Sequence, residues 1–216
     1  MYESISRNLT RSMLELKLWV NGFSDKTPLS DNDAIVRGLF FVYIYGIYEE
    51  VIRQLVAETI RYVNSEEFHI RDCSFELYTL ALSNNYDSLY HVGNEKKWEK
   101  RWDIANRFSS NDIVAIPEET MPTDGKNIRI SQLKSIANSF GIREPILPRQ
   151  EIGHYIEETV ENRNKISHGN SLPKEIGRRY TKGDLLSRCE IISEICEHFI
   201  SIFDSYITRR DFSRSQ

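Results

Sequence analysis

The spacing of hydrophobic residues along this chain is mainly helical. Apolar residues recur three or four positions apart over residues 2–20 and 31–64 and again after Thr181, as they do on the buried face of an α-helix. No stretch alternates apolar and polar residues for long enough between turn residues to indicate a β-sheet. The pattern therefore predicts an all-α protein built as a helical bundle.

The segment 31–64 is apolar on nearly every side. Ile44 belongs to one buried stripe, and Val42 and Tyr43 extend the apolar surface around the helix. A helix of this kind is typical of the centre of a bundle. Ser30 precedes it as an N-cap that can accept a hydrogen bond from a free backbone amide, so we expect the helix to begin at residue 31.

The middle of the chain predicts shorter helices, at residues 75–90, 96–108 and 131–140. We find no repeat or low-complexity tract there. We interpret residues 94–145 as an elaboration inserted into a single domain that covers residues 1–216.

Two further helices follow the elaboration. Pro148 suits a first helical turn and Gly169 suits a left-handed C-terminal stop, so the spacing predicts a helix over residues 148–167. Thr181 and Asp184 resemble a capping box that opens the last helix. That helix carries a heptad-like apolar seam. The seam consists of Leu185, Cys189, Ile192, Cys196, Phe199, Phe203 and Tyr206.

No segment is suited to crossing a membrane. The longest apolar run, residues 38–48, is shorter than the roughly 18 residues that a membrane-spanning helix needs. The first residues lack the basic and apolar regions of a secretory signal. We therefore expect no membrane contact and a cytoplasmic location.

Cysteine usage and net charge limit the possible sites. Cys73, Cys189 and Cys196 are the only cysteines, and no two form a C-x-x-C pair, which argues against a disulfide framework and a zinc site. We expect buried thiols and no metal or other cofactor. The net charge is −4, so a nucleic acid partner would have to be met by a local basic patch.

Arg163 occupies a position where a core residue is expected. It follows Ile156 and precedes Ile166 on the apolar stripe of the predicted helix, and an unpaired buried guanidinium is very costly. One interpretation is a structural ion pair with Glu49 or Glu50 of the central helix. The other is that Arg163 lines a cleft and holds an anion.

Asn164 and His168 are four residues apart and lie on one side of a helix. Arg163 and His168 are five apart, so they converge only if the helix ends near Ser167, as Gly169 predicts. An arginine, an asparagine and a histidine at one helix end would form a phosphate site with an acid–base group.

The sequence Arg163-Asn164-x-x-x-His168-Gly169 resembles the R-x4-6-H motif of the HEPN superfamily. The order of helices is similar to that of the bacterial toxin-like HEPN nucleases of the RiboL-PSP group. The resemblance implies a HEPN-like bundle in which Arg163 and His168 are catalytic and Asn164 orients or binds phosphate. It also implies that Glu49 or Glu50 orients Arg163.

The same resemblance implies an activity and partners. The implied activity is a metal-independent endoribonuclease, a toxin or phage-defence effector that works as a homodimer; an antitoxin or another defence-system protein would be a further partner. The alternative is a catalytically inactive HEPN module that binds RNA or protein or serves for dimerisation. One position departs from the family: the subgroup modified by a nucleotidyltransferase antitoxin has tyrosine where this chain has Asn170.

Two other basic groups are candidates for RNA contact. Lys97, Lys100 and Arg101 alternate with Trp98 and Trp102, a composition that can bind phosphates and stack bases. We favour instead a charged helix face over buried tryptophans. The second group follows the motif and consists of Arg178, Arg179 and Lys182.

Overall fold

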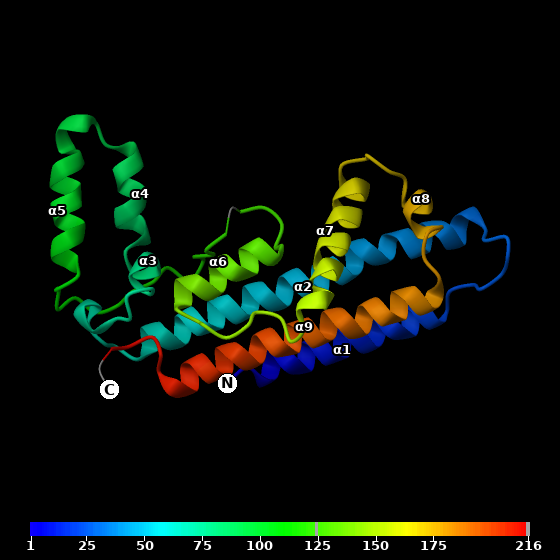
Figure 1. Cartoon of the computed structure of the whole chain (residues 1–216), viewed down its shortest axis with the longest axis horizontal. Coiled ribbons are helices and arrows are strands. Elements are labelled where there is room, and N and C mark those ends of the chain that lie inside the picture. The colour runs from blue at the N-terminus through cyan, green and yellow to red at the C-terminus, as the bar shows by residue number, and fades with distance from the viewer. Residues whose placement is uncertain (124, 215–216) are drawn as a thin grey trace.

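Three long helices run side by side along the molecule (Figure 1). They are α1 (Glu3–Asn21), α2 (Asp31–Ser65) and α9 (Lys182–Arg209). The structure is a computed structural model that describes residues 1–123 and 125–214, and within those residues it contains helices and no β-strand. The all-α prediction is confirmed.

The predicted caps start the long helices. The Ser30 hydroxyl accepts a hydrogen bond from the backbone N–H of Asp33 at 3.1 Å, and Thr181 and Asp184 form the expected reciprocal capping box. Every residue of the predicted seam on α9 is buried. These contacts fix where α2 and α9 begin. The capping residues in the sequence were therefore sufficient to predict the start of both helices.

Helix α7 (His154–Ser167) packs against α2 and stands out to one side of the long helices (Figure 1). Its predicted start at Pro148 was wrong, because a 3-10 turn, η3 (Gln150–Gly153), comes first. A Cβ atom at Gly153 would lie 2.7 Å from the side chain of Ile130, so this turn sits tightly against α6 (Ile130–Phe140). The predicted end is confirmed at Ser167.

A short helix, α8 (Pro173–Gly177), packs on α2 almost backbone to backbone. A Cβ atom at Gly38 would lie 2.0 Å from the carbonyl oxygen of Pro173, and one at Gly177 would lie 1.9 Å from that of Ala34. Two glycines therefore permit the contact. The sequence analysis missed α8, because five residues are too few to show a helical period.

The middle of the chain is less regular than predicted. The helix expected over residues 75–90 is divided at Leu82 into α3 (Tyr78–Ala81) and α4 (Ser83–His91). Helix α5 (Lys97–Arg107) follows after the turn η2 (Asn94–Lys96) and lies antiparallel to α4. This pair projects from one end of the bundle (Figure 1). A last short turn, η1 (Ile70–Asp72), links α2 to α3.

One side of α2 remains open, although its apolar surface predicts a position at the centre of the bundle. Leu39, Val42 and Tyr43 are partly exposed and, with Trp19 of α1, line a shallow groove of about 530 Å³. Burial elsewhere matches the prediction: Cys73, Cys189 and Cys196 are buried and free. None of the helices in the described ranges combines the length and hydropathy that crossing a bilayer requires.

Candidate functional site

Arg163 lies where α7 meets α2 and the loop before α6. Its guanidinium carbon is 4.9 Å from the centre of the Tyr45 ring. One guanidinium nitrogen of Arg163, Nη1, donates two hydrogen bonds. They go to Oδ1 of Asn127 at 3.1 Å and to Oδ1 of Asn164 at 3.0 Å. The side chain is half-buried. Arg163 is thus held by one ring face and two neutral amides.

Tyr45 forms the floor under Arg163 and also holds the loop. Its buried hydroxyl accepts a hydrogen bond from the backbone N–H of Ile128 at 3.1 Å, one residue beyond Asn127. The pKa of Tyr45 is raised, mainly because the ring is buried; the negative charge of Glu49 adds to the shift and Arg163 opposes it. The ring therefore stays neutral and contributes its π-face to the cation.

No carboxylate pairs with Arg163 among the residues described. Glu49 pairs with Arg53, with 3.1 Å between Oε1 and Nη2. Glu50 accepts a hydrogen bond from Gln54 at 2.6 Å and lines the groove between α1 and α2. The structural ion pair, one of the two interpretations of Arg163, is not formed. Neither glutamate forms a hydrogen bond or ion pair with Arg163, and each has a partner on its own helix.

His168 follows the last turn of α7 and is exposed. Its backbone N–H donates to the carbonyl oxygen of Asn164 at 3.0 Å, and the backbone N–H of Asn170 donates to that of Lys165 at 2.8 Å. Gly169 has a φ of 70°, the left-handed conformation that glycine adopts without a steric penalty. This is the predicted helix stop.

The helix stop does not join the imidazole to the arginine by a hydrogen bond. Within the described residues the His168 ring has no hydrogen-bonding or charged partner. Asn164 connects the two residues instead, because its side chain binds Arg163 while its carbonyl accepts the N–H of His168. The site thus presents a held cation and a free imidazole at one helix end.

The neighbouring face of α7 carries a second polar network. The buried Asn162 donates to the hydroxyl of Tyr180 at 2.8 Å, and that hydroxyl donates to Glu158 at 3.0 Å. Arg188 of α9 binds Glu158 with two hydrogen bonds, of 2.9 and 3.0 Å. Here each charge has an opposite charge beside it.

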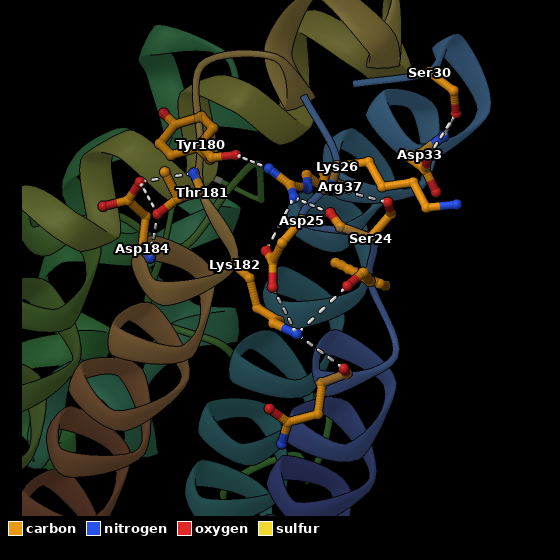
Figure 2. Close-up of polar contacts among 12 residues, drawn as sticks. Ser24, Asp25, Lys26, Ser30, Asp33, Arg37, Tyr180, Thr181, Lys182 and Asp184 are labelled. Carbon is orange, nitrogen blue, oxygen red and sulfur yellow. Dashed lines mark hydrogen bonds and ion pairs between the residues drawn. The ribbon is translucent and has the colours of Figure 1, made fainter. Parts of the chain in front are cut away.

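Two basic residues after the motif are engaged elsewhere, and Figure 2 shows one of them, Lys182. Lys182 pairs with Asp25 at 3.1 Å and donates to the carbonyl oxygen of Asn21 at 3.1 Å. Arg178 pairs with Asp31 at the start of α2. The prediction that these two side chains contact RNA is not supported, because they hold the loop between α1 and α2. Arg179 is exposed.

The same loop is braced from inside by Arg37. This buried side chain donates to the carbonyl oxygen of Tyr180 at 2.7 Å and pairs with Asp25 at 3.6 Å (Figure 2). Asp25 therefore lies between two cations, Arg37 and Lys182.

The basic residues of α5 lie apart from α7, on the projecting pair of helices (Figure 1). The side chains of Trp98 and Trp102 are 65% and 66% exposed. The prediction of a charged face over buried tryptophans was therefore wrong. No cluster of three or more histidine, cysteine, aspartate or glutamate side chains suited to a metal ion occurs in the described ranges.

A comparison with known protein families finds one that matches nearly the whole chain. The model of the HEPN_MAE_28990-like HEPN family matches residues 3–212, so the chain belongs to this HEPN family and the resemblance predicted from Arg163 and His168 is confirmed at the level of the superfamily. Membership of the RiboL-PSP group stays a prediction. No curated protein and no solved structure matches the chain.

Proposed function

We propose that this HEPN domain is a metal-independent endoribonuclease that cleaves RNA through the 2′-hydroxyl of its own substrate. One observation carries the proposal: the half-buried cation of Arg163 rests on a tyrosine ring and two amide oxygens, with no described carboxylate to neutralise it. A buried charge is normally paired. An unneutralised guanidinium in a fixed position favours binding of an anion such as a phosphate.

The proposed chemistry needs a base, an acid and a stabilised phosphorane. His168 removes the proton of the 2′-hydroxyl; the 2′-oxygen then attacks the adjacent phosphorus, and the bond from phosphorus to the 5′-oxygen breaks. Arg163 stabilises the charge that develops on the non-bridging oxygens. Asn164 positions Arg163 through its side chain, and its carbonyl oxygen fixes the backbone of His168. A proton must reach the departing 5′-oxygen to complete the step.

The products test this proposal. Internal attack leaves a 2′,3′-cyclic phosphate, or its hydrolysis product, on one fragment and a 5′-hydroxyl on the other, whereas a metal-activated water usually leaves a 5′-phosphate. We expect RNA to be cut with these ends, EDTA to have no effect, and DNA to stay intact because it lacks the 2′-hydroxyl. Cleavage of DNA or 5′-phosphate ends would contradict the mechanism.

A homodimer is part of the proposal, because one histidine does not easily serve as both base and acid. A second copy would supply the second imidazole to a shared site. Light scattering should then show a two-fold assembly, and the specific activity should fall when the protein is diluted below its dissociation constant. A strict monomer with undiminished cleavage would exclude the shared site.

The main alternative is an inactive HEPN module that binds RNA or protein. It is favoured by the absence of a hydrogen bond between the His168 ring and Arg163 among the described residues. Cell growth separates the two: a toxin or phage-defence nuclease, restrained in its host by an antitoxin or other defence-system protein, should arrest growth when expressed alone. The His168→Ala variant should not. Equal growth with both proteins would favour the inactive module.

A further inference from the structure

The antiparallel pair of α4 and α5, residues 83–107, forms an arm with little contact to the rest of the molecule. No residue of α4 is buried, and Ile104 is the only buried residue of α5. The arm stands clear of the long helices at one end of the bundle (Figure 1). The fold therefore does not need the aromatic and basic side chains near its tip.

Two tryptophans are displayed on the outer side of this arm. Trp98 and Trp102 are four residues apart on α5, so they share one side of the helix, and each is about two-thirds exposed. The guanidinium of Arg101 lies over the Trp98 ring, 4.8 Å from its centre. Large aromatic surfaces left open to solvent are typical of binding sites.

The cations of the arm are not neutralised by neighbours. Lys97, Lys100 and Arg101 form no ion pair with the described residues, although Arg178, Lys182 and Arg188 in the bundle are all paired. The acidic residues Glu99 and Asp103 each follow a tryptophan by one position. Glu99 lies about 60° around the helix from Trp102, and Asp103 lies about 140° from Trp98. Asp103 accepts a hydrogen bond from Asn85 of α4 at 3.4 Å.

A second exposed aromatic ring with a guanidinium lies where the arm joins the bundle. Arg214 is 4.6 Å from the centre of the Phe75 ring. Both line a hollow of about 340 Å³ together with Tyr78, Tyr86 and Phe108. The same combination of flat rings and cations thus occurs at the base of the arm as well as near its tip.

We propose that the arm grips single-stranded RNA, with bases stacked on Trp98 and Trp102 and the phosphates held by Lys97 and Arg101. This inference rests on the proposed function for the choice of RNA, and it adds a binding site separate from Arg163 and His168. Stacking needs the face of a base, which a duplex hides, so the arm selects unpaired strands.

The chemistry favours nucleic acid over a protein partner. A protein partner could cover the two exposed tryptophans with apolar side chains. It would also have to place carboxylates in one fixed arrangement opposite the three unpaired cations. A single strand supplies a flat ring and an anion at every nucleotide, and residues 97–102 of α5 carry both aromatic and basic side chains. Both kinds of group are then used together.

Binding can be measured without cleavage. We would titrate the intact protein with a fluorescently labelled single-stranded DNA, which lacks the 2′-hydroxyl but offers the same bases and phosphates, and the His168→Ala protein with the matching RNA strand and its duplex. In a Trp19→Phe background the only tryptophans are Trp98 and Trp102. We expect their emission to be quenched by either single strand.

Substitutions in the arm should weaken this binding. Trp98→Ala and Trp102→Ala should each weaken it about tenfold, and Arg101→Ala should reduce the slope of log affinity against log salt by roughly 0.7. Matched controls are Tyr43→Ala, an aromatic residue of the α1–α2 groove, and Arg11→Ala on α1. Both controls should bind as the unaltered protein does.

The outcomes separate the arm from the active site. Unchanged affinity in the Trp98→Ala, Trp102→Ala double variant overturns the inference, as does equal binding of duplex and single strand. Loss of self-association in that variant with unchanged RNA binding would assign the arm to protein contact and also overturns it. If RNA binds through the arm but is never cut, the arm stands and the nuclease proposal fails.

Discussion

Arg163 and Arg188 both lie against tyrosine rings near α7, but their guanidinium groups have different partners. Arg163 lies 4.9 Å from the Tyr45 ring centre, and Arg188 lies 4.9 Å from that of Tyr180. Arg188 also binds the Glu158 carboxylate with two hydrogen bonds, whereas Arg163 has neutral amide partners. The protein therefore braces its fold with one guanidinium and leaves the charge of the other available.

Removing Arg163 should have the largest effect on activity. Arg163→Ala should lower kcat/KM for RNA by roughly 10²–10³-fold, the loss typical of a deleted transition-state donor. Its circular dichroism should be unchanged, because the side chain fills no core. The measurement is single-turnover cleavage beside a thermal melt. A variant that unfolds while His168→Ala stays active would make Arg163 a structural residue.

Removing Arg188 should lower the stability of the protein and leave its activity nearly unchanged. Its side chain is 13% exposed and that of Glu158 26%, so the pair is screened in part by solvent and we reduce the usual cost of breaking a buried pair to about 2 kcal/mol. Arg188→Ala should lower the free energy of unfolding by this amount and leave cleavage close to normal below the melting temperature. Urea unfolding measures it, and a loss of cleavage without loss of stability would reverse the assignment.

The Asn127→Asp substitution would give Arg163 a carboxylate partner, as Arg188 has in Glu158. It replaces an amide by a carboxylate of nearly the same shape, 3.1 Å from the guanidinium in the present contact. Neutralising the cation should cost about tenfold in kcat/KM, or roughly 1.4 kcal/mol, with stability equal or slightly higher. Asn127→Ser is the uncharged control. Full activity in the aspartate variant would show that the unpaired charge is not used.

The smallest effect concerns the cap of the helix that carries Arg188. Hydrogen bonds from the hydroxyl and backbone N–H of Thr181 lower the pKa of Asp184. A lowered folded-state pKa contributes stability above the unfolded value near 3.9 and loses it as the pH falls through the folded value. Asp184→Asn should therefore reduce the acid-induced loss of stability, measured by thermal melts from neutral pH downward. An identical pH profile would contradict the pKa shift.

Sequence periodicity identified the long helices, because each buries one continuous face and begins at a recognisable cap such as Ser30 or Thr181. It missed α8, and it missed the break at Leu82. Such short elements depend on contacts with other parts of the fold. The end of α7 was predictable because Gly169 supplies a local stop.

The candidate site was predictable only in part. The motif identified Arg163, Asn164 and His168, since these residues are close in sequence. Asn127 lies 36 positions away from Arg163 and left no local signal. Tyr45 could be recognised only as an apolar position. The alternation of rings and cations on α5 was visible, but its exposure was not, because nothing in the sequence states how far that helix extends from the bundle.

The close packing of α8 on α2 at Gly38 has a consequence for local unfolding. The segment that carries the motif is fastened to α2 twice, at Tyr45 through Arg163 and at Gly38 through α8. These two positions are about two helical turns apart. The helical amides of α7 before the motif turn should therefore exchange more slowly than those of the sparsely buried arm, which opens by itself.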